Sequence, residues 1–476
     1  MSCRHRIESS ATPELFLPAT VDTAGHPGTD PVVRVADLAW LGGPTLTSNV
    51  RIEVSDGRFS SITTGNPGSD GTRLRGIVLP GLVNAHSHAF HRRLRGLTQA
   101  LGGDFWLWRQ HMYEVAGSLT PESYESLATA VFMEMAMAGV TAVGEFHYVH
   151  HQMGGVPYAD RNEMGHAVIR AARSAGIRMS LLDAGYFTAG FNDEPLSPVQ
   201  TRFSDRGASD WLDRVAELRA AYEGEADVVV GLAPHSVRAV PEAVLVEVAD
   251  RVTAGTPLHV HVSEQPAENR ECLDATSLTP TALLHRVGLL GPDTTLVHAT
   301  HVTGGDIEHI AGAGAGVCYC ATTERDLADG IGPAAELAEA GVPLCVGSDS
   351  HAVIDLFEEA RGVELHTRLA TGRRGVFAPY ELMEAATVTG SASLGFSTAG
   401  LAEGSAADFI VIDPDSPRLA GLTDDAALDT TVFAATASDV RDVFVGGRQI
   451  VTDGAHQGWE DAKSGFAASV LPFQTL

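Results

Sequence analysis

Two histidines one residue apart, His86 and His88, stand directly after a short apolar run over residues 77–83. The run predicts a buried strand. Because the side chains of a strand alternate between its two faces, the two imidazoles point to the same side. Histidine is the commonest protein ligand of divalent transition metals, so this pair predicts half of a metal site. A chance His-x-His in a loop is the alternative, since the chain contains 20 histidines.

The elements that position this pair form a repeating pattern along the chain. Strand-like apolar runs alternate with Ala- and Glu-rich segments of helix length, such as residues 120–138 and 210–222. About eight such units predict a (β/α)8 TIM barrel, whose active site lies at the carboxyl ends of the strands. Turn residues are expected there in a barrel without a site. The residues found there are instead polar and of ligand type: His86, His88, Glu145, His147, His235, Arg238, His261, Glu264, His298, His301, Asp349 and His351.

These strand-end residues predict a centre with one divalent cation. The His-x-His pair, a third histidine and a carboxylate would hold it and leave a position for water. The third histidine is His261 or His259, and we favour His261 because it lies nearer the end of its strand. Asp349 follows the last predicted strand and is the expected carboxylate ligand. A turn or helix-cap aspartate is the alternative reading of Asp349.

A cation at this position predicts hydrolytic chemistry. Coordination lowers the pKa of water toward neutrality, so that hydroxide forms at working pH. Glu264, three residues after His261, could take a proton from water and pass it to a departing nitrogen. His298 could hydrogen-bond the attacking oxygen, and Asp349 completes the expected catalytic set. A helix-start glutamate and a buried core histidine are the alternatives for Glu264 and His298.

Composition excludes several functional classes. The net charge of −28 argues against nucleic-acid and anionic-membrane partners. Without a run of about 18 apolar residues or the apolar core of a secretory signal, we expect a cytoplasmic protein. The only lysine, Lys463, makes Schiff-base chemistry improbable. Five scattered cysteines argue against a disulfide framework, and Cys318 and Cys320 predict a buried thiol pair.

Both ends of the chain are rich in short strands. Pieces with turn signals lie between residues 32 and 77 and return over 407–413 and 439–451. Neither end can form a domain alone, so we expect both to fold together as a small β-sandwich. The predicted division is an N-terminal arm over 1–30, a sandwich of 31–77 with 400–476, and a barrel over 78–399.

The strand-end residues resemble those of the amidohydrolase superfamily. The shared features are the His-x-His of strand one, the histidine followed by glutamate of strand five, the histidine of strand six and the aspartate of strand eight. Many members bridge two metals with a carboxylated lysine, but this barrel has none, which leaves the mononuclear deaminases. Within that branch, five segments resemble the formimidoylglutamate deiminases: 84–90, 104–109, 144–151, 232–240 and 259–265.

This resemblance implies one zinc ion per subunit, with iron or manganese as alternatives. It implies attack of water on a formimino carbon in histidine degradation, with release of ammonia and N-formylglutamate. It also implies a homodimer, and substrate contacts from Arg109, Tyr148 and Arg238. Guanidinium groups suit the two carboxylates of such a small-molecule substrate. The family usually has glutamine where this chain has His91, a position expected to touch substrate, so carboxylate recognition could differ.

Two other readings stay open. The first is a mononuclear deaminase of another small amidine, or of a purine, pyrimidine or triazine ring. Such sites prefer an aromatic slot over paired arginines. The second is a metal-free relative kept as a binding or scaffold protein, against which the intact set of ligand-type residues weighs.

Overall fold

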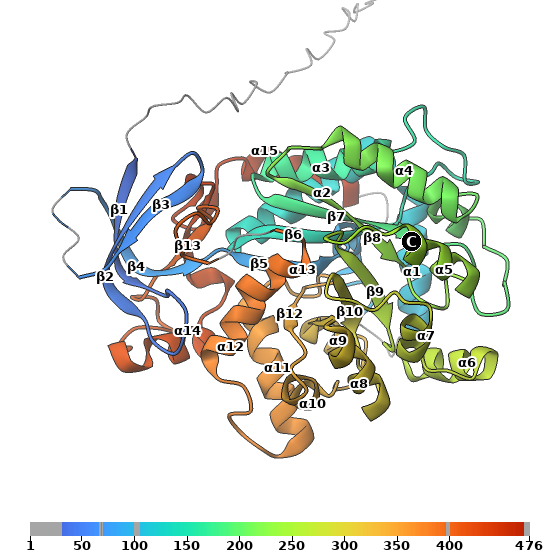
Figure 1. Cartoon of the computed structure of the whole chain (residues 1–476). Coiled ribbons are helices and arrows are strands. Elements are labelled where there is room, and N and C mark those ends of the chain that lie inside the picture. Colours follow the sequence, from blue (N-terminus) through green and yellow to red (C-terminus); the bar gives the residue numbers. More distant parts are fainter. Residues whose placement is uncertain (1–30, 66–67, 69, 100–104, 397–399, 471–476) are drawn as a thin grey trace, which may run out of the picture.

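The structure is a computed structural model that describes residues 31–65, 68, 70–99, 105–396 and 400–470. The predicted N-terminal arm lies outside the described residues. The described chain forms two eight-stranded sheets with helices around one of them (Figure 1). Among these helices, none combines the length and the apolar character that crossing a bilayer requires.

The larger sheet is the predicted barrel. Its parallel strands are hydrogen-bonded in chain order. The ring closes between its first and last strands, where the Asp349 amide donates to the His86 carbonyl at 3.0 Å and the His88 amide donates to the Asp349 carbonyl at 3.1 Å. The strands are β5 (Leu82–Ser87), β6 (Val140–His147), β7 (Arg178–Gly185), β8 (Val228–Pro234), β9 (Leu258–Val262), β10 (Thr294–His298), β11 (Gly316–Tyr319) and β12 (Leu344–Val346).

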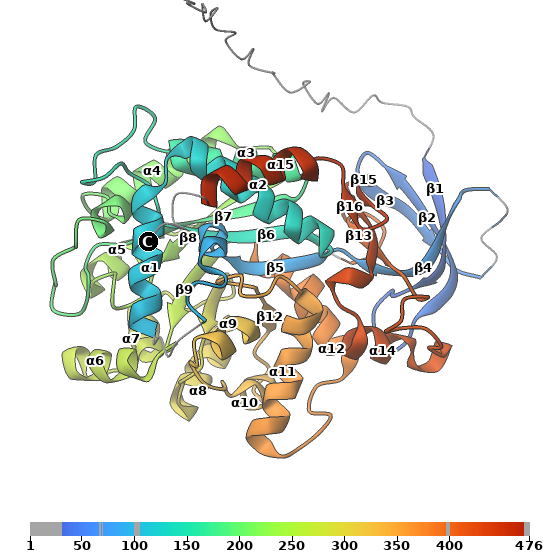
Figure 2. The ribbon, with the colours of Figure 1, turned by 180° about the vertical axis from the view of Figure 1, so that it is seen from behind.

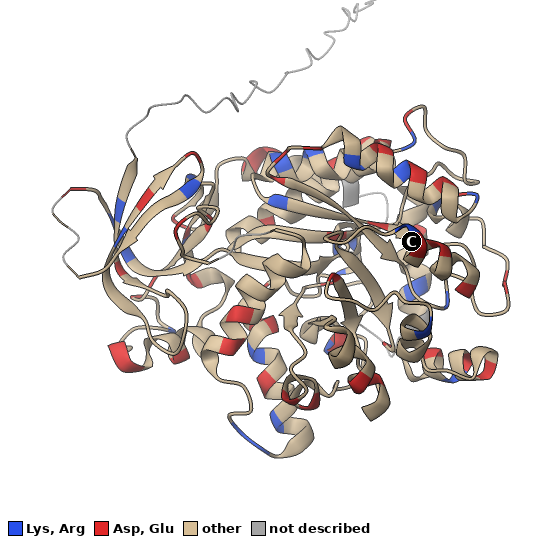
Figure 3. Cartoon of the chain, in the orientation of Figure 1, with Lys and Arg blue, Asp and Glu red and all other residues tan. Residues whose placement is uncertain are grey.

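The longer helices around the barrel pack on it through buried apolar side chains. In α3, for example, Met164, Val168, Ala171 and Ala175 recur at helical spacing and are buried. The helices are α1 (Phe105–Ser118), α2 (Pro121–Met137), α3 (Glu163–Ala175), α4 (Ala208–Ala221), α5 (Glu242–Arg251), α6 (Pro266–Thr276), α7 (Pro280–Arg286), α8 (Gly304–Ala313), α9 (Ala321–Asp326), α10 (Ala334–Glu339), α11 (Leu356–Thr371), α12 (Pro379–Glu384), α13 (Gly390–Ser393), α14 (Ala427–Ala434) and α15 (Trp459–Val470). Figure 3 shows acidic residues spread over the outer helices, with arginines between them.

The second sheet joins the two chain ends, as predicted. Strands β13 and β4 pair antiparallel at its centre, and a core that includes Phe59, Val78, Phe409 and Phe444 packs on it. Helix α15 returns to the barrel and lies along α2 (Figure 2). The strands are β1 (Val32–Ala39), β2 (Thr47–Ser55), β3 (Arg58–Thr63), β4 (Thr72–Pro80), β13 (Phe409–Ile412), β14 (Val440–Val445), β15 (Arg448–Thr452) and β16 (Ala455–His456).

The prediction of one strand over residues 77–83 is wrong. The run divides at Gly81, so that β4 belongs to the end sheet and β5 to the barrel. A Cβ at Gly81 would lie 2.1 Å from the Thr141 hydroxyl, so the close approach of β6 requires glycine here. Both strands are buried, and hydropathy alone cannot show that the chain passes from one sheet to the other.

A buried ion-pair network ties α4 to the barrel. Arg214, of which 1% is exposed, contacts both oxygens of Asp183 at 2.8 Å and Asp205 at 2.9 Å. Trp211 donates its indole N–H to Asp183 at 2.9 Å. Burial opposes ionisation of the two aspartates, but Arg214, together with a hydrogen bond between His151 and Asp205, holds the pKa of each below the usual range. The network therefore depends on all three charges being present.

We expect Arg214→Met to lower the free energy of unfolding by about 3–5 kcal/mol, because it leaves two buried carboxylates without their cation. Chemical denaturation of the purified variant measures this loss. Arg206→Met is the matched control, since the Arg206 side chain is 88% exposed and forms an ion pair with Asp210 one turn away. Its expected loss is below about 0.5 kcal/mol. Equal losses in the two variants would contradict a special role for the buried network.

Candidate metal centre and substrate pocket

Four predicted ligands converge at the carboxyl ends of the barrel strands. The Nε2 atoms of His86 and His261 lie 3.1 Å apart, and those of His88 and His261 lie 3.4 Å apart. Asp349 Oδ1 lies 3.4 Å from Nε2 of both His86 and His88. All four side chains are buried. The end of β5 supplies two of these donor atoms, the end of β9 supplies one and the closing turn supplies one, and all four face a common point.

This arrangement fits a tetrahedral divalent cation. Donor atoms about 2.1 Å from such an ion lie about 3.4 Å from one another, which is close to the observed spacing. His88 Nδ1 lies 3.0 Å from the Phe146 carbonyl oxygen, and His261 Nδ1 lies 3.0 Å from the His235 carbonyl oxygen. These hydrogen bonds place the ring proton on Nδ1, so that Nε2 is unprotonated and can bind a metal at the centre. Burial lowers the pKa of all three histidines, which favours the neutral, metal-binding form.

Asp349 occupies a special backbone position. Its φ of 43° lies in the left-handed region, where a non-glycine residue is strained. The two closing hydrogen bonds of the barrel hold it there. Burial opposes ionisation of Asp349, but the hydrogen bond and charge of His86 and the charges of neighbouring histidines keep its pKa below the usual range. Asp349 is therefore an anionic donor facing the three imidazoles.

The other two histidines considered as ligands lie differently. His259 is one layer deeper in β9, and its Nε2 lies 2.9 Å from the Ser393 carbonyl, away from the centre. His91, in the short helix η1 (Ala89–Leu94), lies 2.9 Å from the Tyr148 hydroxyl through its Nε2. A donor atom of His91 also falls within 4.8 Å of donors of His88 and Asp349. His91 thus borders the centre while it contacts a predicted substrate residue.

The predicted proton-transfer residues lie beside the centre. Glu264 Oε1 is 3.8 Å from His298 Nε2, and Asp349 Oδ2 is 4.0 Å from the same nitrogen. Glu324 was not predicted from the sequence as a site residue. Its Oε1 lies 3.4 Å from His298 Nδ1. Burial opposes protonation of His298, yet the three surrounding carboxylates raise its pKa to about 10. Burial also raises the pKa of Glu264, which makes its carboxylate a stronger base.

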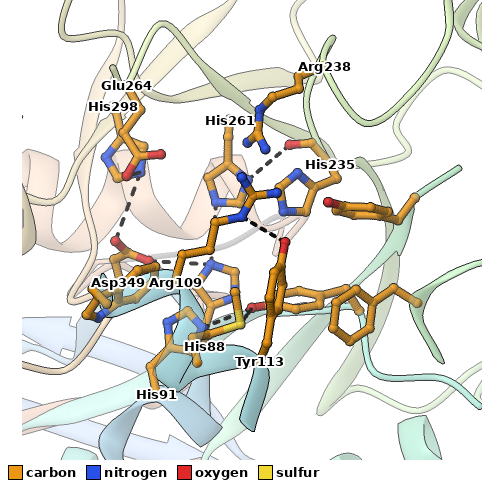
Figure 4. A pocket seen from close by; sticks show the side chains of 15 residues that line it. His88, His91, Arg109, Tyr113, His235, Arg238, His261, Glu264, His298 and Asp349 are labelled. Atoms are coloured by element: carbon orange, nitrogen blue, oxygen red, sulfur yellow. Dashed lines mark hydrogen bonds and ion pairs between the residues drawn. The ribbon is translucent and has the colours of Figure 1, made fainter. Parts of the chain in front are cut away.

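A pocket opens from this centre toward α1 and carries the predicted substrate residues (Figure 4). Arg109 extends from α1 across the pocket, and its Nε donates to the Tyr113 hydroxyl at 2.7 Å. Arg238 directs its guanidinium into the pocket beside His235 and His261. Within the described chain, no hydrogen bond or ion pair engages that guanidinium. The two carboxylates of the pocket, Glu264 and Asp349, lie at the metal end.

Several lining residues were not predicted as site residues. His235 was recognised at a strand end without an assigned role, and it presents its carbonyl to His261. Trp108, Tyr113, Tyr186 and Phe203 line the far wall. Tyr113 lies four residues after Arg109 on one helix, a spacing that places both on the same face and could have indicated the pair. Tyr186 lies in the loop after β7 and Phe203 in a short helix over Gln200–Phe203, and neither position gave such a signal.

Comparison with known proteins decides the family. The sequence profile described as "Amidohydrolase family" matches residues 77–450. The chain belongs to the amidohydrolase family. This amidohydrolase is 38% identical to the formimidoylglutamate deiminase of Pseudomonas aeruginosa over 429 residues, covering 88% of this chain and 94% of that protein. It is 30% identical over 431 residues to the 5-methylthioadenosine/S-adenosylhomocysteine deaminase of Natronomonas pharaonis, with 88% and 93% covered.

Solved structures agree with this assignment. A crystal structure of an amidohydrolase from Brucella melitensis superimposes with a TM-score of 0.87 at 33% identity, covering 93% of this chain and all of that chain. An adenosine deaminase from Xanthomonas campestris, solved with bound zinc, gives 0.79 at 22% identity, with 94% and 99% covered. The barrel architecture and the resemblance expected from sequence are thereby confirmed.

Proposed function

We propose that this amidohydrolase uses one zinc ion to hydrolyse N-formimino-L-glutamate to N-formyl-L-glutamate and ammonia, a step of histidine degradation. The observation that carries the proposal is the separation of charge along the pocket. Glu264 and Asp349 lie on one side of the pocket, where a cationic amidinium would lie, and the guanidinium groups of Arg109 and Arg238 lie on the side of Tyr113 and His235. An amidinium with carboxylates attached matches that pattern. The similarity to the Pseudomonas aeruginosa enzyme supports the same substrate.

The donor set supports zinc. Three neutral imidazoles with one carboxylate are borderline ligands in a near-tetrahedral arrangement, which Zn²⁺ accepts more readily than Mg²⁺ or Ca²⁺. A zinc ion held there would lower the pKa of water to about 7 and so supply the nucleophile. We assign its binding to His86, His88, His261 and Asp349.

The surrounding residues perform the proton transfers. Glu264 accepts a proton as water adds to the formimino carbon, and it donates that proton to the terminal nitrogen. The C–N bond then breaks, ammonia leaves, and the remaining hydroxyl proton passes to Glu264 as the formyl C=O forms. His298 donates an N–H to the attacking oxygen and stabilises charge on the tetrahedral carbon. Glu324, on the other side of the imidazole, orients His298. Burial of these groups strengthens each electrostatic contact.

The remaining residues bind and orient the substrate. Arg238 offers a guanidinium to a carboxylate, and Arg109 approaches from α1. Tyr148 and His91 share a hydrogen bond at the wall near His88, where they can contact the chain between formimino group and carboxylate. Contacts at both ends of the substrate hold the formimino carbon opposite Glu264. The reacting groups are thereby oriented before the reaction begins.

Product identification tests the proposal. Incubation of the zinc-loaded protein with N-formimino-L-glutamate should release ammonia and N-formyl-L-glutamate, measured by mass spectrometry and an ammonia assay. 5-Methylthioadenosine, guanine and cytosine serve as competing substrates, because ring deaminases are among the relatives. Faster ammonia release from one of these rings would replace the proposed substrate. Formamide and glutamate as products would reject the assignment of the leaving nitrogen.

A further inference from the structure

The far end of the pocket contains a hydrogen-bond cluster centred on Gln200, at the start of the short helix η2 (Gln200–Phe203). Gln200 is buried, and its Nε2 lies 2.8 Å from the Tyr186 hydroxyl and 3.1 Å from the Tyr113 hydroxyl. The Ser197 amide donates to its Oε1 at 2.9 Å. Because a backbone N–H can only donate, Oε1 must face Ser197 and the NH2 group must face the tyrosines. The orientation of the amide is therefore fixed.

The cluster has more donors than acceptors. Gln200 supplies two N–H groups, and Arg109 supplies one to Tyr113 at 2.7 Å and another to Tyr186. The Tyr113 and Tyr186 hydroxyls also hydrogen-bond to each other. The two phenol oxygens accept at most about four hydrogen bonds, so the four N–H groups and one tyrosine O–H exceed what they can accept. The O–H proton of the other tyrosine must then be donated elsewhere. Burial raises the pKa of Tyr113, so its hydroxyl keeps its proton at neutral pH.

Both hydroxyls border the substrate pocket. Tyr113 and Tyr186 line it together with Arg109 and Arg238. An acceptor that satisfies an O–H donor beside guanidinium groups is a carboxylate. We propose that Gln200 is a positioning residue, which sets the paired Tyr113 and Tyr186 hydroxyls so that one O–H donates toward the substrate carboxylate distal to the formimino group. This inference rests on the proposed function and adds the group that determines its specificity for an anion.

Replacement of Gln200 by glutamate tests the inference. The side chain keeps its shape and its bond to Ser197, but the new carboxylate oxygen accepts both tyrosine O–H groups and turns them away from the substrate. We expect Gln200→Glu to raise KM for N-formimino-L-glutamate about 50-fold with kcat within about threefold. For N-formimino-L-glutamine, whose distal group is an amide, KM should change less than about fivefold. Such a shift in preference is not expected from a structural defect.

Two further variants keep the result decisive. Gln152→Glu adds the same charge at an exposed glutamine, whose Nε2 donates to the Pro157 carbonyl. This control variant should have the KM and kcat of the wild type. Tyr186→Phe removes one hydroxyl and should raise KM for N-formimino-L-glutamate about tenfold. This variant tests the inference if Gln200→Glu does not fold. An equal rise in KM for both substrates, or no rise in a folded Gln200→Glu protein, would overturn the inference.

Failure of the proposed function can be told apart from failure of this inference. If the wild type releases no ammonia from N-formimino-L-glutamate, the proposed function fails on its own. Calorimetric binding of glutarate, a plain dicarboxylate, then tests the cluster directly. Binding at least about tenfold weaker in Gln200→Glu than in Gln152→Glu supports the inference, and equal binding rejects it.

Discussion

Replacing Glu264 by glutamine is expected to leave the metal in place and to lower kcat by about 10³-fold. The amide has the same shape but can neither accept nor return a proton, so both transfers at the formimino group fail. Glu264 is not one of the four groups that surround the metal position, and it approaches His298 rather than the ligands. Elemental analysis and the rate of ammonia release measure the two expectations separately.

The pH dependence gives a second measure of the same substitution. Because burial raises the pKa of Glu264, the limb of the wild-type kcat profile that reports this carboxyl should lie above the usual range for glutamate. That limb should be absent from the residual activity of Glu264→Gln. A profile unchanged by the substitution would assign the limb to another group.

The matched control is Glu268→Gln, four residues along the chain. Glu268 is also buried, and burial raises its pKa to about 7. It contacts the backbone of Glu264 but does not line the pocket, and glutamine retains an oxygen for that contact. We expect kcat within about fivefold of the wild type. Full activity in Glu264→Gln, or equal losses in both variants, would exclude the proposed proton shuttle.

Much of this site was predictable because barrel topology does the positioning. The two-residue period of a strand places His86 and His88 on one side, and parallel strands bring their carboxyl ends to one rim. Those two rules suffice to bring together residues from β5, β9 and the closing turn, although these residues are spread over more than half of the sequence. The choice of His261 over His259 followed from distance to the strand end, and the geometry places His261 in the cluster.

The far wall of the pocket could not be predicted in the same way. Tyr186 comes from a loop and Gln200 from the short helix η2, and their approach to Arg109 depends on how α1 and η2 pack over the barrel mouth. No period links positions in different loops. Glu324 was missed for a related reason, because it lies on the short helix α9 after β11 and reaches His298 only through the curvature of the barrel. The division at Gly81 shows the same limit for the fold, since it depends on the neighbouring Thr141.

Two alanine substitutions in β9 should have opposite effects on the metal. His261→Ala removes a ligand nitrogen, and we expect loss of bound zinc and a fall in activity of at least about 10³-fold. His259→Ala removes a ring that contacts the Ser393 carbonyl in a deeper layer, and we expect it to retain zinc and most of its activity. It should lose about 1–3 kcal/mol of stability, because a buried acceptor is left unsatisfied.

Thermal unfolding with and without zinc distinguishes these effects without an activity assay. A metal that binds only the folded state stabilises it by about 2.7 kcal/mol at a free concentration one hundred times Kd. The wild type and His259→Ala should therefore show a higher Tm on addition of zinc, the latter from a lower starting value. His261→Ala should show no rise, because two histidines and Asp349 alone bind the ion weakly. If zinc raises the Tm of His261→Ala but not that of His259→Ala, the third ligand is His259 rather than His261. The proton-transfer role of Glu264 would then lose its geometric basis.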